Sequence, residues 1–117
     1  MIKIIDCIKG LAELPDQSVD IVVTSPPYNI GVPYANYNDN LTYEDYYKFT
    51  KEWINQISRV IKNNGSFFLN IGEKPSEKDF LNTFIKHSNL YVSFYPQNTI
   101  IWVKSIAIND VTYGHYK

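Results

Sequence analysis

The sequence lacks features that several large classes of protein require. Cys7 is the only cysteine in 117 residues, so neither a disulfide within the chain nor a cysteine-based zinc site can form. His87 and His115 have no partners at metal-ligand spacing, and we expect no metal site. No apolar run approaches membrane-spanning length, and the amino terminus is charged too early for a signal peptide. We therefore expect a soluble, cytoplasmic protein that does not contact membranes.

Positive charge is also scarce in this chain. Arg59 is the single arginine, and the formal net charge is -1. Proteins that bind nucleic acid usually present a basic face toward the phosphates. We therefore expect any contact with nucleic acid to depend on particular residues, or on a basic part of the protein outside these 117 residues.

Apolar residues, in contrast, are plentiful enough to build a core, at 44% of the chain with 15% aromatic. Short apolar runs predict strands, and apolar residues at helical spacing predict helices. In chain order we expect a strand at 2–5, a helix at 7–14, a strand at 21–24, a helix from 43 to 63, a strand at 66–71, a helix at 76–85 and strands at 90–95 and 99–103. This alternation predicts an α/β fold with a mainly parallel sheet and flanking helices.

Two of these elements carry more specific signals. Residues 21–24 are apolar at successive positions, which predicts a strand buried on both faces. Thr42 and Asp45 form a near capping box at the start of the long helix, and Asn64-Gly65 supplies a stop signal at its end. The inward face of this helix is marked by residues at helical spacing: Tyr46, Phe49, Trp53, Ile57 and Val60.

The segment Ser25-Pro26-Pro27-Tyr28 follows the strand at 21–24 directly. In parallel sheets, chemistry takes place beyond the carboxyl ends of the strands. Proline fixes φ and has no N–H to donate, so this segment presents carbonyls and side chains on a stiff support. A rigid turn without further function would carry the same residues. The segment also suits a reaction in which hydrogen-bond acceptors must be held still.

Methylation of the exocyclic amino group of a base is such a reaction. The nitrogen lone pair is delocalised into the ring, so acceptors on the N–H bonds are needed to favour a pyramidal, nucleophilic nitrogen. The Ser25 hydroxyl and the Pro26 carbonyl are candidate acceptors, with Pro27 keeping the turn rigid. Tyr28 is a candidate for stacking on a base flipped out of the duplex, which is worth about 1–3 kcal/mol.

The run from Thr24 to Tyr28 resembles the catalytic motif [DNS]-P-P-[YFW] of the DNA amino-methyltransferases. In that family Ser at the first position is usual for cytosine-N4 enzymes and Asp is commoner for adenine-N6 enzymes. The segment from Asp6-Cys7 to Tyr28 is similar to the opening of the β-class enzymes, whose catalytic half precedes the cofactor-binding half. The helix around Trp53, the strand at 65–72 and the segment at 100–104 resemble that class in order and spacing.

The resemblance implies a Rossmann-like, S-adenosylmethionine-dependent methyltransferase fold, with Ser25, Pro26, Pro27 and Tyr28 as the catalytic residues. It implies double-stranded DNA as the substrate, in a prokaryotic cytoplasm and in a restriction-modification context.

The resemblance also assigns residues to the cofactor. It places Asp6 and Cys7 at the adenine edge of S-adenosylmethionine and Asn29 along the same cleft. Asp6 has a second interpretation as the N-cap of the helix that follows, and Cys7 as a small buried residue.

One part of the β-class pattern does not occur among the five glycines of the chain, namely the F-x-G-x-G loop that holds the cofactor. We therefore expect residues 1–117 to form an incomplete catalytic domain without that loop and without the target-recognition region. Such a piece would self-associate or be completed by a carboxyl-terminal half. Two alternatives to cytosine-N4 methylation stay open: adenine-N6 methylation, and a non-catalytic subunit that needs a second chain to bind cofactor.

Overall fold

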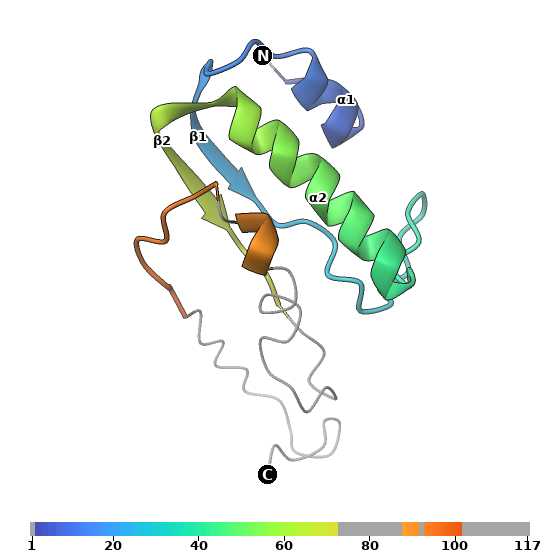
Figure 1. Ribbon diagram of the computed structural model, residues 1–117. Coiled ribbons are helices and arrows are strands. Elements are labelled where there is room, and N and C mark those ends of the chain that lie inside the picture. The colour runs from blue at the N-terminus through green and yellow to red at the C-terminus, as the bar shows by residue number, and fades with distance from the viewer. Residues whose placement is uncertain (1, 73–87, 92, 102–117) are drawn as a thin grey trace, which may run out of the picture.

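The computed structural model describes residues 2–72, 88–91 and 93–101 (Figure 1). The elements are helix α1 (Cys7–Ala12), strand β1 (Val19–Thr24), helix α2 (Tyr43–Val60), strand β2 (Ile61–Leu69) and the 3-10 helix η1 (Ser88–Tyr91). β1 and β2 pair in parallel, and α2 packs beside α1 and across one face of the sheet. The expected α/β class and parallel pairing are confirmed for the described residues, whereas the expected helix at 76–85 lies outside them.

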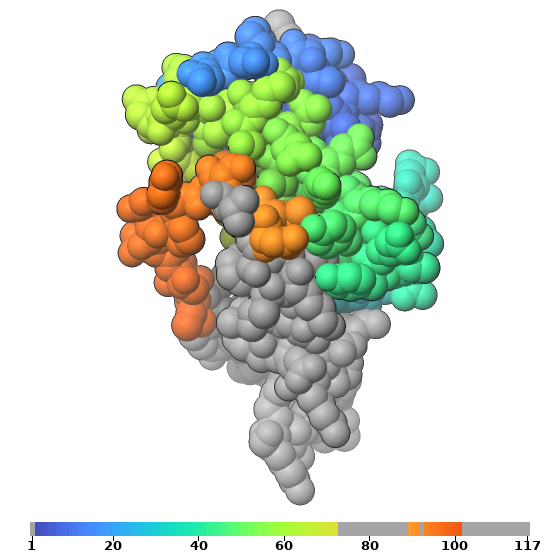
Figure 2. Space-filling model, viewed as in Figure 1, coloured from blue at the N-terminus to red at the C-terminus, as the bar shows by residue number. Residues whose placement is uncertain are grey.

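The core lies between α2 and the sheet. Trp53, Ile54 and Ile57 are buried on the inward face of α2, as are Tyr46 and Val60 toward its two ends. Partly buried side chains from every other element close around the cluster: Ile8, Leu11, Val22, Phe49, Phe67, Leu69, Leu90, Tyr91 and Phe94. η1 packs against α2 and supplies two of these (Figure 2). The expected inward face of the long helix is confirmed.

The predicted start of α2 agrees with the structure, but its predicted end does not. At its start, the Thr42 hydroxyl oxygen accepts a hydrogen bond from the Asp45 amide at 3.2 Å, so Thr42 is confirmed as the N-cap. The Asp45 carboxylate accepts from the Thr42 hydroxyl at 2.8 Å. The helix ends at Val60, however, and β2 begins at once, so the stop expected at Asn64-Gly65 is wrong.

Gly65 lies within β2, where close contacts leave no room for a side chain. A Cβ at this position would lie 2.7 Å from the Ile61 side chain and 2.9 Å from the Asp20 carbonyl oxygen. The pairing is irregular here, because the register shifts between the pairs Val19–Ile61 and Ile21–Ser66. Glycine is a common residue where two backbones approach so closely.

The two faces of the sheet differ in burial. Val22 pairs with Phe67, and both turn toward α2. Ile21 and Val23 point the other way and are 60% and 74% exposed. The expectation that β1 is buried on both faces is therefore wrong for the described residues, because α1 and α2 cover one face of the sheet only.

Three expected strands differ from the structure. Residues 2–5 form no strand, because β-branched residues favour an extended chain but a strand also needs a neighbouring edge to bond. Of the strand expected at 90–95, residues 90 and 91 belong instead to η1, and the Phe94 amide donates to the Tyr91 carbonyl at 3.0 Å; residue 92 lies outside the described residues. Leu90, Tyr91 and Phe94 all reach the core. Residues 99–101 form no strand either, and the remainder of that prediction lies outside the described residues.

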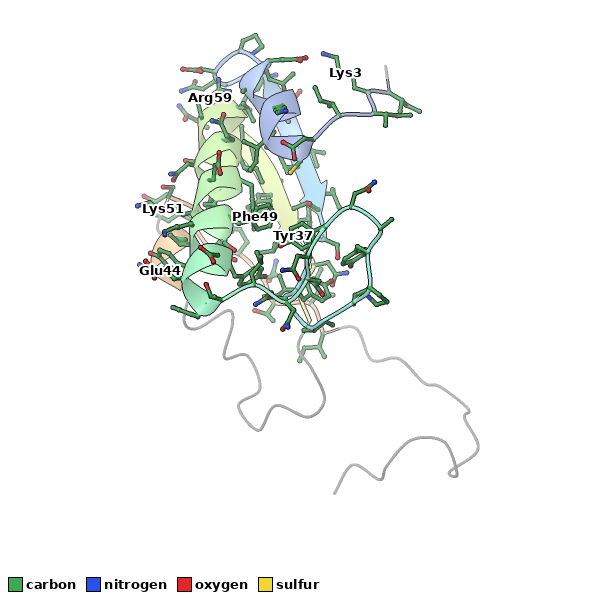
Figure 3. All side chains as sticks on the ribbon, turned by 90° about the vertical axis from the view of Figure 1, so that its right-hand side faces the viewer. Lys3, Tyr37, Glu44, Phe49, Lys51 and Arg59 are labelled. Atoms are coloured by element: carbon green, nitrogen blue, oxygen red, sulfur yellow. The ribbon has the colours of Figure 1, made fainter. Side chains whose placement is uncertain are left out.

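Arg59 fastens α1 to α2. Its Nη1 donates to the Leu14 carbonyl at 2.9 Å and to Asp16 Oδ1 at 2.6 Å, and its Nη2 donates to the Leu11 carbonyl at 2.9 Å. These carbonyls close the carboxyl-terminal end of α1, where helices need such donors. Figure 3 shows Arg59 at the carboxyl-terminal end of α2. These contacts of Arg59 fix the direction of α1 and therefore the place of Asp6 at the other end of that helix.

No helix in the described part of the chain is both long enough and apolar enough to cross a membrane.

Candidate functional site

The turn Ser25 to Tyr28 leaves the sheet at its carboxyl edge. β1 ends at Thr24, whose carbonyl accepts a hydrogen bond from the Asn70 amide at 2.9 Å, one residue beyond the end of β2. The turn therefore emerges beside the segment that follows β2. This is the edge at which parallel sheets place their chemistry, as the sequence predicted.

Two of the predicted catalytic side chains meet in the structure. The Ser25 Oγ lies 2.6 Å from the Tyr28 Oη, and either hydroxyl can be the donor. Ser25 is exposed, and Tyr28 is half-buried. The pair therefore presents a hydroxyl and the side of an aromatic ring at one place on the surface.

The two prolines differ in what their carbonyls do. The Pro27 carbonyl accepts a hydrogen bond from the Tyr46 Oη at 2.9 Å, so the first turn of α2 holds the middle of the catalytic turn. Among the described residues none donates a hydrogen bond to the Pro26 carbonyl. Burial is the main reason that the pKa of Tyr46 lies well above its ordinary value of 10.0. Tyr46 therefore stays protonated and remains a donor throughout the neutral range.

The burial of Tyr46 has a consequence for stability at alkaline pH. A tyrosine in the unfolded chain ionises at a pKa of about 10. In the folded chain, burial raises the pKa of Tyr91 to about 12 and raises the pKa of Tyr46 above that of Tyr91. Above pH 10 the unfolded state loses protons that the folded state keeps, so the free energy of unfolding must fall as pH rises. We expect a plateau below about pH 9.5 and a steady loss above about pH 10.

Urea unfolding between pH 8 and about pH 11 measures this loss. Tyr46→Phe should reduce the slope above pH 10, because it removes one of the tyrosines whose pKa burial raises. The control is Tyr34→Phe, which alters a half-exposed tyrosine of the loop and should leave the slope as in the wild type. An equal slope in Tyr46→Phe and wild type would contradict the assignment.

Gly72 is a site residue that sequence reasoning did not single out. A Cβ on Gly72 would lie 3.1 Å from a ring carbon of Tyr28, so the backbone beyond β2 packs against that ring. A larger residue here would push the ring or the backbone by a few tenths of an ångström. The sequence offered no signal, because 43 positions separate the two residues.

Asn29 turns the chain sharply after Tyr28. It has a positive φ of 59°, in the left-handed region that asparagine tolerates better than most residues. Its Nδ2 donates to the Leu41 carbonyl at 3.0 Å, and its Oδ1 accepts from the Leu41 amide at 2.6 Å. Its own amide donates to the buried carboxylate of Asp39 at 2.9 Å. Asn29 thus ties the exit of the catalytic turn to the end of the loop, and Asp39 is a second residue that the sequence did not reveal.

Asp6 and Cys7 lie at the start of α1. Asp6 Oδ1 accepts from the amides of Ile8 and Lys9, each at 3.1 Å, so the N-cap interpretation is confirmed. Cys7 is exposed, and its expected burial is wrong because Ile8 and Leu11 are the residues of α1 that face the core. Partial desolvation of the sulfur and the charge of Asp6 raise the pKa of the Cys7 thiol, so it is a weak nucleophile at neutral pH.

An aromatic group lines the loop beside the turn. The Tyr37 ring lies between Tyr34, at a centroid distance of 6.1 Å, and Phe49 of α2, at 5.7 Å. Figure 3 shows Tyr37 and Phe49 facing each other between the loop and the helix. Tyr34 is 49% exposed, so it is the member of the group that a large ligand can reach.

Comparison with known proteins decides the family. A model of DNA methylases, N6_N4_Mtase, matches residues 19–115. The chain belongs to this DNA methylase family. The matched region includes the turn Ser25 to Tyr28, the loop after it and the whole of α2 and β2.

Relatives of this DNA methylase chain are named Type II methyltransferases. M.MjaVI of Methanocaldococcus jannaschii is 37% identical over an alignment 111 positions long, which covers 89% of this chain and 55% of that protein. M.BglII of Bacillus subtilis is 37% identical over an alignment 108 positions long, which covers 85% of this chain and 28% of that protein. M.HpaI of Haemophilus parainfluenzae is 38% identical over 69 residues, 59% of this chain and 22% of that protein. The chain thus spans about half of the first relative and about a quarter of the others.

Proposed function

We propose that this chain carries the catalytic turn of a DNA methyltransferase that modifies an exocyclic amino group, cytosine N4, in double-stranded DNA. The observation that carries the proposal is the turn Ser25-Pro26-Pro27-Tyr28 at the carboxyl edge of a parallel sheet, in a chain of the DNA methylase family. Serine at the first position favours cytosine over adenine as the target.

The turn's own atoms account for activation of the amine. The exposed Ser25 hydroxyl and the Pro26 carbonyl accept from the two N–H bonds of the target amino group. With both bonds held, the nitrogen can pyramidalise and direct its lone pair at an incoming methyl carbon. The methylated nitrogen then carries a positive charge and loses one of its two held protons to solvent, along the hydrogen bond to the exposed Ser25 hydroxyl. Prolines on both sides of the carbonyl keep the acceptors from moving, so the turn lowers the barrier by orientation.

Tyr28 receives the base. Gly72 packs against its ring, and the ring supplies an aromatic face for stacking on a flipped base. The hydrogen bond between the Tyr28 and Ser25 hydroxyls occupies the serine before substrate arrives. The arriving amino group then takes over Ser25, and the Tyr28 hydroxyl turns to solvent.

The residues assigned to S-adenosylmethionine fit it in part. This group supplies a methyl carbon on a positively charged sulfur, which leaves as a neutral thioether. Asp6 uses one carboxylate oxygen as the helix cap and has the other to accept from the adenine amino group. Cys7 is exposed beside it, so its backbone can reach the ring. Asn29 offers less, because Leu41 takes one donor and one acceptor of its side chain.

The exposed face of the sheet supports the proposal that residues 1–117 form part of a larger Rossmann-like domain. Ile21, Val23 and Phe68 are apolar and more than half exposed on that face. A complementing carboxyl-terminal half, or a second copy of the chain, would bury them.

The decisive experiment is methyl transfer from radiolabelled S-adenosylmethionine to unmethylated plasmid DNA by the full-length gene product, followed by nucleoside analysis. N4-methylcytosine is the expected product. N6-methyladenine would keep the mechanism and overturn the choice of base. No label in either nucleoside would leave the chain as a non-catalytic subunit and contradict the proposal.

A further inference from the structure

Asp39 is a buried carboxylate in the loop between the catalytic turn and α2. It is 2% exposed. Its Oδ1 accepts from the Asn29 amide at 2.9 Å, and its Oδ2 accepts from the amides of Ile30 at 3.1 Å and Val32 at 2.9 Å. The Asp39 carbonyl also accepts from the Gly31 amide at 2.7 Å. Four successive residues after Tyr28 therefore all donate to one aspartate.

The backbone around this carboxylate has the form of an anion-binding nest. Asn29 and Gly31 have positive φ values of 59° and 81°. Left-handed residues among right-handed ones turn neighbouring N–H groups toward a common point, where they bind an anion. We call the amides of Asn29, Ile30 and Val32 with this carboxylate the Asp39 nest. Asn29 is not glycine, so its conformation costs free energy that the surrounding contacts must offset.

The charge of Asp39 is met by these amides rather than by a cation. In the described ranges, no lysine or arginine pairs with Asp39. Asp16 and Asp20, in contrast, form surface ion pairs with an arginine and a lysine side chain. Hydrogen bonds from N–H groups to a carboxylate are stronger than neutral ones. An asparagine at position 39 would place an NH2 group against amides that themselves donate, and an alanine would leave all three without an acceptor.

The Asp39 nest is one of two anchors on either side of Tyr28. Before Tyr28, the Pro27 carbonyl is held by the Tyr46 hydroxyl at 2.9 Å. After it, the Asn29 amide is held by Asp39 at 2.9 Å. Tyr28 is thus carried on a segment whose peptide groups are fixed at both ends by side chains from α2 and from the loop.

We propose that Asp39 is a positioning residue for the catalytic turn, because its carboxylate fills the backbone nest directly after Tyr28 and so holds Tyr28 and Ser25 in place for the target base. Asp39 itself touches neither base nor cofactor. The inference rests on the proposed function for its catalytic consequence, while the nest itself can be tested without activity.

A misplaced turn should slow the chemical step more than it weakens DNA binding. Displacing reacting groups by about 1 Å can cost about 100-fold. We expect Asp39→Asn and Asp39→Ala to lower kcat about 10- to 100-fold while the KM for DNA changes less than about threefold. If Asp39 served stability alone, its variants would contain less folded protein. Their kcat per folded molecule and their KM for DNA would then both stay near the wild-type values.

Formate provides the sharpest test, because it replaces the carboxylate that Asp39→Ala removes. Added formate, at constant ionic strength with chloride as the comparison anion, should restore kcat of Asp39→Ala and leave the wild type unchanged. The matched control is Glu44→Ala, which removes an exposed carboxylate that pairs with Lys48 on the outer surface of α2 and should show no response to formate.

Amide hydrogen exchange, read at residues 29, 30 and 32, separates this inference from the proposed function. Both Asp39 variants should lose protection at these amides, and formate should return it in Asp39→Ala, whether or not the protein methylates DNA. Unchanged protection in either variant would overturn the nest, and restored protection without restored kcat in an active enzyme would overturn the positioning role. If Asp39→Ala does not fold, Asp39→Asn still decides the matter through its exchange pattern and its kcat and KM.

Discussion

Replacing Ser25 by alanine is expected to lower methyl transfer about 100- to 1,000-fold, the usual cost of removing one positioned hydrogen-bond partner from a transition state. The physical reason is that the target amino group loses one of its two acceptors and stays closer to planar. Ser25 is exposed, and among the described residues its side chain bonds to Tyr28 alone, so the fold should be unaffected. Single-turnover methylation of plasmid DNA measures the effect on the chemical step.

Two control variants isolate the role of the Ser25 oxygen. Tyr28→Phe breaks the same Ser25–Tyr28 hydrogen bond but keeps the acceptor and the ring, so it should cost no more than about tenfold, the worth of one ordinary hydrogen bond. Ser18→Ala removes an exposed hydroxyl that donates to the Pro15 carbonyl at 2.7 Å, away from the turn, and should be neutral. Equal losses in Ser25→Ala and Tyr28→Phe would mean that the pair matters rather than the acceptor.

The largest effect on stability is expected at Ile54. This side chain is 1% exposed at the centre of the cluster between α2 and the sheet. Truncation to alanine removes buried methyl groups and leaves a cavity, which costs about 2–5 kcal/mol. Because domains are stable by only about 5–15 kcal/mol, this change should lower the urea midpoint substantially.

The control for Ile54→Ala is Lys51→Ala on the same helix. Lys51 is exposed, and alanine is at least as good a helix former, so the free energy of unfolding should stay within about 0.5 kcal/mol of wild type. Figure 3 shows Lys51 on the outer side of α2. A loss of less than about 1 kcal/mol for Ile54→Ala would mean that the core between α2 and the sheet is not packed as described.

The contacts that shape the catalytic turn were beyond prediction because they join distant positions. The Tyr46 hydroxyl reaches a carbonyl 19 residues earlier, and the sequence indicated only that Tyr46 faces inward. Asp39 stands in a polar loop where nothing in its neighbours indicated burial. Gly72 matters only because the sheet register brings it to Tyr28. Each of these contacts depends on tertiary folding that brings distant parts of the chain together, and local sequence patterns do not encode it.

Glycine and apolar runs misled the prediction for a related reason. Asn64-Gly65 has the composition of a helix stop, yet Gly65 is needed for a close approach within β2. The apolar run in β1 predicted two buried faces, but burial depends on which elements cover the sheet. Exposure of Ile21 and Val23 is therefore a property of the arrangement and not of the strand.

The sequence by itself determined the α/β class, the caps at Asp6 and Thr42, the inward face of α2 and the position of the proline turn at the end of β1. These follow from short-range rules: side-chain caps act within three residues, and hydrophobic periodicity acts within one helix or strand. Only the tertiary structure decided that Tyr46 and Asp39 grip the turn on both sides of Tyr28 and that Gly72 backs its ring. Hydrogen bonds between distant residues exist only after the core has packed, because packing alone brings those groups within reach.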